Sequence, residues 1–594
     1  MLFGKHINRY YLRYSPMLLL GVLALILVDY MQLLIPKLYK IVINGLNEGV
    51  VEINGEIMPF TMTVLLDEIC LPLIFIIISL VVGRFLWRIS FFGSANKLEA
   101  DLRIRMFDHS KDLSQEYYQT NKVGTLMSLF TNDLETVQDC FGSGILMFCD
   151  ALLLGTLAII KMAKMNWMLT LFSLIPMSIL MFIGTVVGKY MMKKWEVRQE
   201  AFSSLSDFSQ EIFSGISAIK AFVKEFTELL NFRRLNKHNE KANVDYTRAS
   251  TILNVSVMLF VESVVCIILG YGSYLVYNGV FNAGELIEFI GYFTTIVWPV
   301  MAVSELIEMT SRGNASLKRI GELLDAKIDV CDNENVTDID FIGGEIEFKN
   351  LTFNHPKSET FALENVSFKI EKGENVGIIG RTGSGKTTVV DLILRIYNVP
   401  NNTVFIDGHD INTIPIKTVR KFASYVPQDN FLFSDTIENN IAFGVDELNQ
   451  DEIESVSKMA DVHSNISEFQ LGYKTILGER GVTVSGGQKQ RISIARALMK
   501  NASILILDDS VSAVDVKTEK VILENLRNNR KGKTTILIAH RISTIENMDK
   551  IIFMENGTVS AVGTHKELYD SNLEYRKMVQ LQSLDEEREV SENV

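Results

Sequence analysis

The sequence has few of the residues that would assign it to several common classes of protein. Its 594 residues include 5 cysteines, 10 prolines and 4 tryptophans, and the formal net charge is −13. No two cysteines form a C-x-x-C pair, so neither a disulfide framework nor a zinc site is indicated, and we expect buried free thiols. The acidic balance argues against nucleic acid as a partner, since nucleic-acid binding needs a basic face.

Long apolar runs are abundant in the first half of the chain, and six of them approach the ~20 residues that a membrane-spanning helix needs. The six spans are predicted near Met17–Ile43, Cys70–Phe92, Gly142–Ile160, Trp167–Val187, Val255–Tyr277 and Leu286–Glu308. Two long connections between them, Gly93–Phe141 and Gly188–Asn254, are rich in Lys and Arg. The positive-inside bias therefore places these connections and the N-terminus in the cytoplasm.

The same connections carry helical periodicity, which indicates helices that continue beyond the membrane and turn back. We expect two intracellular hairpins with tips near Phe107–Ser114 and Phe208–Gly215. Before the first span, Phe3–Tyr14 mixes aromatic and cationic residues; it is either a helix at the membrane surface or a plain basic flank.

The second half reads as a soluble α/β domain. We predict a membrane domain over 1–320, a polar linker over 321–340, an α/β domain over 341–585 and a disordered acidic tail over 586–594. Strands are expected at Glu345–Leu351, Ala362–Ile370, Asn375–Ile379, Ile504–Leu507 and Thr534–Ala539, and a helix at Gln490–Leu498.

The strand ending at Ile379 leads into a glycine-rich turn that fits the phosphate-binding pattern G-x-x-x-x-G-K-[ST]. Its residues are Gly380, Arg381, Thr382, Gly383, Ser384, Gly385, Lys386, Thr387 and Thr388. Backbone amides and the following helix N-terminus would hold phosphates, Lys386 would reach the β- and γ-phosphates, and the Thr387 hydroxyl would ligate Mg²⁺. The motif thus predicts ATP as the bound nucleotide and Mg²⁺ as its metal.

Two further patterns lie downstream. Ser485-Gly486-Gly487-Gln488 precedes a helix, where Ser is either a helix cap or, with the glycine amides, part of an anion site. The apolar run Ile504–Leu507 delivers Asp508 as a carboxylate ligand for Mg²⁺.

Taken together, these motifs in this order resemble the ATP-binding-cassette (ABC) exporters, in which six membrane helices are fused to an ATPase domain and two halves share their ATP sites. The resemblance implies that Ser485 to Gln488 close over ATP held by the other subunit, and that hairpin tips dock on ATPase domains. It also implies that Gln428 contacts metal and attacking water, that His540 contacts the γ-phosphate and that Asp515 belongs to the D-loop at the dimer interface. Gly478-Glu479-Arg480-Gly481 is similar to the exporter X-loop.

Two positions depart from the family pattern. His355 stands where an adenine-stacking Tyr is usual, and Asp509 stands where the catalytic Glu is usual. Asp presents its carboxylate about 1.5 Å short of the position that Glu would reach, and such a misplacement can lower the rate about 10²-fold. The chain therefore resembles the degenerate-site subunit of bacterial heterodimeric multidrug exporters, whose partner supplies the Glu.

In the membrane half, ionisable residues are candidates for function because they are costly there. Asp150 and Glu262 lie deepest in the predicted spans and would favour cationic substrates; Tyr292, Phe293 and Trp298 would offer stacking surface, unless they serve packing. The prediction is a plasma-membrane pump for hydrophobic or cationic compounds. A lipid or peptide exporter, possibly homodimeric, and an ATP-gated regulator that does not transport remain alternatives.

Overall fold

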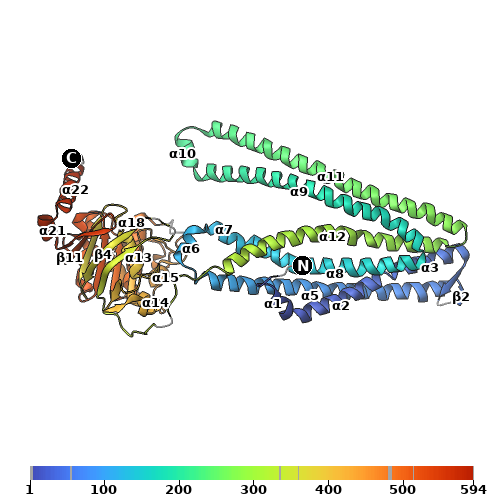
Figure 1. Cartoon of the computed structure of the whole chain (residues 1–594), viewed down its shortest axis with the longest axis horizontal. Helices are drawn as coiled ribbons and strands as arrows, with labels where there is room; N and C mark the ends of the chain where they lie inside the picture. Colours follow the sequence, from blue (N-terminus) through green and yellow to red (C-terminus); the bar gives the residue numbers. More distant parts are fainter. Residues whose placement is uncertain are drawn as a thin grey trace. The chain divides into compact units, whose positions relative to one another are not determined.

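The computed structural model describes residues 4–53, 56–333, 336–356, 358, 360–478, 484–512 and 514–592. The described chain forms two compact units (Figure 1). The membrane unit comprises Met1–Lys111 and Val123–Ala326, and the nucleotide unit comprises Asp112–Lys122 and Lys327–Val594. A short segment between two membrane helices is therefore packed with the nucleotide unit.

The membrane unit is almost entirely helical because its long apolar stretches satisfy their backbone groups internally, as a bilayer requires. Its helices are α1 Asn8–Arg13, α2 Ser15–Gln32, α3 Ile35–Glu48, α4 Met62–Val64, η1 Leu65–Cys70, α5 Leu71–Ser110, α7 Val123–Ser128, η2 Leu129–Asp133, α8 Leu134–Met165, α9 Trp167–Ser214, α10 Ile216–Ala221, α11 Glu225–Tyr277 and α12 Ala283–Leu324. A hairpin of β1 Val50–Ile53 and β2 Glu56–Pro59 follows α3.

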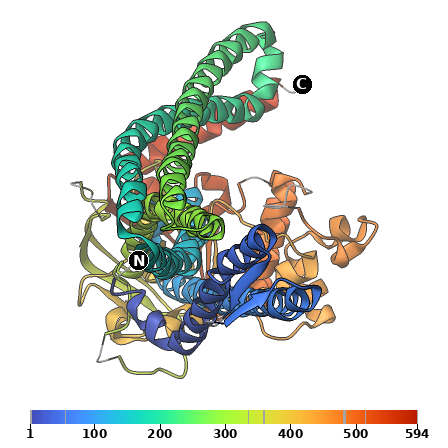
Figure 2. The same cartoon turned by 90° about the vertical axis from the view of Figure 1, so that its right-hand side faces the viewer.

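Among the described residues, five helical stretches are long and apolar enough to cross a bilayer: Ser15–Glu48, Met62–Ser110, Val123–Met165, Glu225–Tyr277 and Ala283–Leu324. The predicted fourth span begins as the apolar helix Trp167–Ile179 at the start of α9. Helices α9 and α11 run side by side along most of their length (Figure 2). α8 packs against α12, and α2 packs against α5.

The turns of the two long hairpins lie later in the chain than predicted. α5 ends at Ser110 and is followed by the short helix α6 Gln115–Thr120, whereas α9 ends at Ser214 and is followed by α10. Each turn is thus built around a separate short helix rather than around the last residues of the long one.

The N-terminal segment binds the end of the last membrane helix. Lys5 Nζ donates to Asp325 Oδ1 over 2.7 Å, and His6 Nε2 lies 3.0 Å from Asp325 Oδ2. The Lys5 and His6 hydrogen bonds lower the pKa of Asp325 to about 2. Arg105 of α5 contacts the other ring nitrogen of the buried His6, so three parts of the unit meet at this cluster. We call it the N-terminal latch.

The nucleotide unit is built on a six-stranded sheet in the order β12-β11-β5-β10-β9-β8, in which neighbours are parallel except β11 and β12. A second, four-stranded sheet has the order β4-β3-β6-β7. The strands are β3 Ile346–Phe353, β4 Leu363–Ile370, β5 Asn375–Gly380, β6 Val404–Ile406, β7 His409–Asp410, β8 Ala423–Val426, β9 Ile504–Asp508, β10 Thr534–Ala539, β11 Lys550–Glu555 and β12 Thr558–Gly563. The five strands expected from the sequence correspond to β3, β4, β5, β9 and β10.

Helices cover the central strands, which read as continuous apolar runs because both faces are buried. The helices are α13 Lys386–Ile393, η3 Ile411–Thr413, α14 Ile416–Phe422, α15 Ile437–Ala442, α16 Gln450–Met459, α17 His463–Ser467, η4 Gly472–Lys474, α18 Gly486–Met499, α19 Val516–Asn529, α20 Ile542–Ile545, α21 His565–Ser571 and α22 Leu573–Glu592. The expected helix Gln490–Leu498 is the main part of α18.

The connection between the units is shorter and more ordered than expected. α12 continues to Leu324, and the described linker residues are bound to the nucleotide unit. The buried Arg395 guanidinium donates to Cys331 O over 3.2 Å and to Asp332 Oδ1 over 3.3 Å, while Thr337 N donates to Thr413 O. The described part of the tail expected to be disordered, residues 586–592, is the last part of α22.

The cysteines are free thiols, as predicted, but their burial differs. Cys140 is buried, Cys70 and Cys149 are half-buried, and Cys266 and Cys331 are exposed. The expectation of general burial is therefore wrong for Cys266, which lies on α11, and for Cys331, which lies in the linker rather than in an apolar run.

Candidate functional site

The phosphate loop joins β5 to α13, and close packing requires glycine at its ends. A Cβ on Gly380 would lie 2.2 Å from the Met554 carbonyl oxygen. Gly385 has a φ of +93° and would bring a Cβ within 2.6 Å of Leu363 Cδ2. Between them, Arg381, Thr382 and Gly383 are exposed, as is Thr387 at the start of the helix. The loop thus presents an exposed concave backbone over a rigid base.

Lys386 lies beneath this loop rather than in solvent. Its Nζ donates to Gly380 O over 2.9 Å and to Arg381 O over 3.0 Å, and burial lowers the pKa of its ammonium group although Asp508 and Asp509 act in the opposite direction. Ser384 Oγ is buried, and no hydrogen-bond partner for it is found in the described chain. A buried cation and an unsatisfied hydroxyl at one loop fit a bound phosphate group.

Asp508 ends β9 and is only 1 % exposed. Its carboxylate is hydrogen-bonded to Thr387 and accepts from the Tyr425 hydroxyl over 3.4 Å. Burial raises the pKa of Asp508, with the nearby Asp509 adding to the effect, whereas these hydrogen bonds and Lys386 lower it. A divalent cation beside Thr387 and Asp508 would offset the burial of this charge, so the residues present fit Mg²⁺.

Two residues near Asp508 were missed by the sequence-based prediction. Tyr425 belongs to the same stretch as Gln428 and donates to the Asp508 carboxylate. Asp391 lies one turn after Thr387 on α13, and burial, with the charge of Asp508, raises the pKa of its carboxyl to about 6. The helical spacing of Thr387 and Asp391 is the signal that could have revealed the second of them.

Asp509 leaves the strand in a left-handed conformation with a φ of 47°. Its amide donates to Ile538 O of β10 over 3.0 Å, and its carbonyl accepts from Gln490 and Ser512. Asp tolerates this backbone region better than most residues do. The backbone that carries the Asp509 carboxylate is therefore held by three hydrogen bonds. Gln428 lies two residues after β8, the strand next to β9, and its side chain is exposed.

His540 follows β10, and its backbone is held by the C-terminal helix. Gln582 Nε2 donates to His540 O over 2.7 Å, and Gln582 Oε1 accepts from Ile542 N over 2.8 Å. The side-chain amide of Gln582 on α22 thus forms hydrogen bonds on both sides of the turn that carries His540. Nothing in the sequence patterns around Gln582 indicated this contact.

His355 lies in the loop after β3, beside the phosphate-loop helix. Its Nε2 is 3.2 Å from Thr388 Oγ1, and its ring packs edge-on against Tyr397 and Phe353, with ring centroids 5.2 and 5.4 Å away. Tyr397 is also bound to α6, because Gln119 Nε2 donates to its hydroxyl over 3.0 Å and Gln119 Oε1 accepts from it over 3.2 Å. A short path of contacts therefore links α6 to the phosphate loop within the nucleotide unit.

Ser485 caps α18 in a reciprocal arrangement. The Gln488 amide donates to Ser485 Oγ over 3.3 Å, and the Ser485 amide donates to Gln488 Oε1 over 3.0 Å. The serine thus serves the helix-cap role considered from the sequence, and its hydroxyl hydrogen stays available to donate. Gly486 is exposed, and a Cβ there would meet open space. Gly487 follows on the first turn of the same helix.

Other sequence-predicted motifs are described only in part. Most of the expected X-loop, Glu479 to Gly481, lies outside the described residues, as does Ala513. Asp515 caps α19, where its Oδ1 accepts from Thr518 N over 3.0 Å, and that backbone hydrogen bond lowers the pKa of the exposed carboxylate.

The five membrane candidates divide into two groups. Trp298 Nε1 donates to Asp150 Oδ2 over 2.9 Å, so the structure joins these two. Glu262 is exposed on α11. By contrast, Tyr292 and Phe293 are each 1 % exposed inside the helix packing, and the Tyr292 hydroxyl donates to Glu288. The packing alternative therefore describes these two rings, which have no exposed face for a compound.

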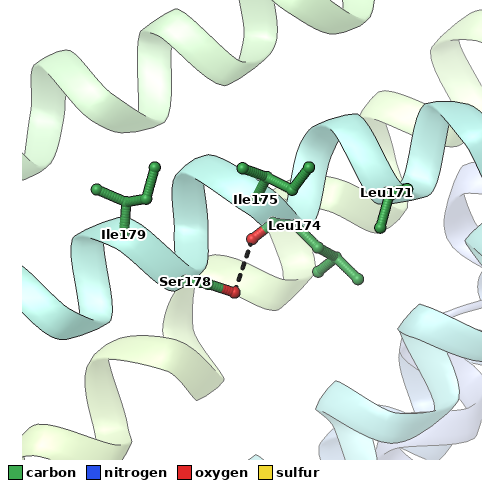
Figure 3. A pocket seen from close by; sticks show the side chains of 5 residues that line it. All are labelled: Leu171, Leu174, Ile175, Ser178 and Ile179. Carbon is green, nitrogen blue, oxygen red and sulfur yellow. Dashed lines mark hydrogen bonds between the residues drawn. The ribbon is translucent and has the colours of Figure 1, made fainter.

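A shallow apolar depression lies on α9, lined by Leu171, Leu174, Ile175, Ser178 and Ile179 (Figure 3). The Ser178 hydroxyl donates back to Leu174 O over 3.0 Å, which hides its polar character within the helix. The surface carries no charged side chain among these five and suits lipid contact rather than chemistry.

Comparisons with known proteins agree with this geometry. Residues 18–300 match the ABC transporter transmembrane region, and residues 363–512 match the ABC transporter family. The chain is 35 % identical to the "Probable multidrug resistance ABC transporter ATP-binding/permease protein YheI" of Bacillus subtilis (strain 168), over 98 % of this chain and 97 % of that protein. It is also 35 % identical to the "Multidrug resistance-like ATP-binding protein MdlA" of Escherichia coli (strain K12), over 95 % of this chain and 94 % of that protein.

The fold has a solved counterpart in a bacterial Atm1-family ABC exporter with ATP bound, with a TM-score of 0.76 and 24 % identity, over 97 % of this chain and 98 % of that one. The described helices and sheet follow the same order of membrane region and ATPase domain. The chain belongs to the ABC transporter family and is a half-transporter of the exporter type, in which ATP hydrolysis is coupled to transport across a membrane.

Proposed function

We propose that this chain is the degenerate-site subunit of a heterodimeric pump that expels hydrophobic or cationic compounds from the cell. The observation that carries the proposal is the combination of an intact signature, Ser485 to Gln488, with Asp509 at the position of the catalytic base. A chain of this kind supplies a complete signature to its partner's ATP site while its own site hydrolyses slowly.

At its own site, the phosphate loop would bind the ATP phosphates through backbone amides and Lys386. Thr387, Asp508 and Gln428 would hold Mg²⁺, which when bound neutralises charge on the phosphates. The buried, unpartnered Ser384 Oγ and the desolvated Asp508 support this assignment, since each gains a partner when phosphate and metal bind.

Asp509 would act as the general base, which must come within hydrogen-bond reach of the attacking water. Because its backbone is fixed by Ile538 O and Gln490, the shorter side chain cannot be compensated by a shift of the strand end. His540, held through Gln582, would donate to the γ-phosphate. The expected result is tight ATP binding with slow turnover.

Two features support a second half-transporter as the partner. The hairpin of α9 and α11 makes its main helix contacts within itself, and bulky apolar residues next to α10 are exposed: Phe213 by 74 %, Phe222 by 74 % and Val223 by 80 %. Exposed apolar residues at a cytoplasmic turn fit an interface with another protein chain. A partner with Glu at the base position would form one competent site with this chain's signature.

The cargo is inferred from the membrane unit and from the relatives. Asp150 and the half-exposed ring of Trp298 form a neighbouring acid and aromatic pair, which fits a cationic amphiphile. Relatives over nearly the full chain are named as multidrug-resistance proteins. The pump would lie in the plasma membrane with its N-terminus and nucleotide unit in the cytoplasm, where ATP binding shifts the population from inward-open to outward-open states.

The decisive experiment compares ATPase activity of the purified chain alone with that of its complex with a half-transporter from the same cell that has Glu at the base position. We expect slow turnover alone and fast turnover in the complex, with turnover lost when the partner's base is changed from Glu to Gln. Brisk hydrolysis by this chain alone at both sites would refute the asymmetric assignment. Drug-stimulated ATPase and vesicle flux would separate a pump from an exporter of lipid or peptide, or from a regulator without flux.

A further inference from the structure

Glu519 is a buried acid of the nucleotide unit that neither the sequence motifs nor the proposed function uses. It lies on the first turn of α19 and is 4 % exposed. Its amide donates to Asp515 O over 2.9 Å, while the Asp515 side chain caps the same helix. A buried carboxylate is costly without a hydrogen-bond partner, so Glu519 needs a contact that compensates for its burial.

That contact is a hydroxyl group on a different helix. Thr544 Oγ1 donates to Glu519 Oε1, and Thr544 is itself 6 % exposed on α20. The bond joins residues 25 positions apart in the chain, on either side of β10. Because the partner is a neutral donor rather than a cation, the contact requires an accepting oxygen at position 519, which the amide of a Gln also supplies.

The helix that carries Thr544 directly follows the turn of His540 and is only four residues long. Strand β5 packs closely against it, since a Cβ on Gly377 would lie 2.8 Å from Ile545 Cβ. The C-terminal helix α22 is hydrogen-bonded to the backbone of its first residue. The side chain of Thr544 supplies a third constraint, and this one comes from α19.

The start of α19 lies next to the segment expected at the dimer interface. Asp515, which caps α19, is exposed and belongs to the expected D-loop. Ser512, at the start of that segment, donates through its hydroxyl to Asp509 O over 2.9 Å. Residues 512–519 are thus bonded to the backbone of the expected base at one end, and to the helix after the His540 turn at the other.

We propose that Glu519 is a positioning residue for ATP hydrolysis, which holds the His540 turn in place through its bond to Thr544. The start of α19 is thereby connected to the turn that faces the γ-phosphate, so that contact of the partner with Asp515 is transmitted to His540. The inference rests on the proposed function for the role of His540 and on the expected place of Asp515. Glu519 acts through Thr544 and not on the nucleotide itself.

The test isolates hydrolysis at this chain's own ATP site, in the purified complex whose partner has its base changed from Glu to Gln. Thr544→Val keeps the shape of the side chain but removes the donor, and it should lower kcat about fivefold with KM for ATP changed by less than about twofold. Glu519→Ala should have the same effect, and Glu519→Gln should restore the rate to within about twofold because its oxygen accepts. Glu524→Ala, exposed on the same helix, is the matched control.

Two further backgrounds separate positioning from a general loss of stability, which would lower activity in each of them. In a His540→Ala background, Thr544→Val should lower the rate no further. Asp515→Ala loosens the first turn of α19 by removing its cap, and its effect on this chain's own site should likewise not add to that of Thr544→Val. Additive losses in either background, or an unchanged kcat in Thr544→Val, would overturn the proposal.

Amide hydrogen exchange tests the contact without hydrolysis. Residues 540–545 should exchange about fivefold faster in Thr544→Val and Glu519→Ala than in the wild type and Glu519→Gln. Equal exchange in all four proteins would overturn the inference whatever their rates of hydrolysis. A wild-type complex in which this chain's site turns over as fast as its partner's would refute the asymmetric assignment, while exchange at 540–545 would still decide whether Glu519 holds the turn.

Discussion

The phosphate loop and the signature helix belong to the same nucleotide unit, yet they differ in completeness. On the phosphate-loop side, Lys386 and Asp508 are buried, but the residue at the expected base position, Asp509, is an aspartate with a backbone fixed by β10. On the signature side, Ser485 and Gln488 form a reciprocal cap and Gly486 faces open space. Under the proposed function, the phosphate-loop side would bind ATP but hydrolyse it slowly, whereas the signature side has every residue of its motif.

The difference between the two sides of one nucleotide unit indicates how two ATP sites shared with a second chain could be unequal. In a homodimer, damage to either side affects the same two sites. In the proposed heterodimer, the signature serves the partner's fast site and the phosphate loop serves this chain's slow site. Substitutions on the two sides should therefore have unequal effects on the complex.

The largest effect is expected from Gly486→Asp. A carboxylate on the first turn of α18 would place negative charge at a helix N-terminus where a γ-phosphate is expected to bind. ATPase of the heterodimer should fall about 10²-fold or more, measured as steady-state phosphate release. A half-buried residue three positions further along the same helix, Lys489→Ala, is the control. A mild effect of Gly486→Asp would contradict the assignment of the fast site.

A smaller loss is expected from Lys386→Ala. It removes the cation from the phosphate loop and should abolish ATP binding at this chain's own site, which photolabelling of this subunit would report. Turnover of the complex should fall by about tenfold or less, because the fast site keeps its own lysine. Lys417→Ala, on the exposed face of α14, controls for loss of a positive charge. Equal losses for Lys386→Ala and Gly486→Asp would indicate symmetric sites.

Asp509→Glu should reduce the difference in ATP hydrolysis rate between the two sites. The longer side chain restores the reach of a general base, so hydrolysis at this chain's own site should rise by up to about 10²-fold while the complex as a whole changes less. The rate is best measured with the partner's base replaced by Gln. The left-handed backbone at Asp509 makes the substitution cost about 1 kcal/mol of stability, which thermal unfolding would check. An unchanged rate would indicate a further defect in the partner's signature.

The smallest effect concerns Gln582. Gln582→Ala removes both hydrogen bonds that hold the His540 turn. Because His540 would then be slightly displaced, we expect kcat for ATP hydrolysis to fall by about two- to fivefold while the affinity for ATP stays nearly unchanged. In a His540→Ala background the same substitution should add nothing. Gln580→Ala, exposed on the same helix, is the matched control. Faster amide exchange at 540–545 would show the loosening directly.

The sequence was a sound guide wherever chemistry demands a fixed spacing. The glycine-rich turn after β5, the position of Asp508 at the end of a buried strand and the order of membrane and ATPase regions could be predicted because backbone geometry around phosphate allows few alternatives. Hairpin tips were placed too early because periodicity alone does not reveal where a long helix gives way to a short one, as at Ser110 and Ser214.

Contacts between distant residues could not be predicted. The hydrogen bonds of Gln582 with the His540 turn, of Trp298 with Asp150 and of Gln119 with Tyr397 join residues that no motif connects. For Tyr292 and Phe293 the sequence left stacking surface and packing open, since hydropathy cannot tell which face of a membrane helix meets another helix; both rings are buried. Such pairings follow from tertiary packing, for which one sequence carries little signal.

The N-terminal latch sets a condition on how the protein is made. Lys5 and Asp325 are 320 residues apart. At synthesis rates of about 5–20 residues per second, Asp325 is therefore added to the chain roughly 15–60 s after Lys5. During that interval the aromatic and basic residues of α1 must be sheltered elsewhere, and the membrane surface is the nearest place that accommodates both kinds. Closure of the latch would then mark the moment when the last membrane helix has been inserted.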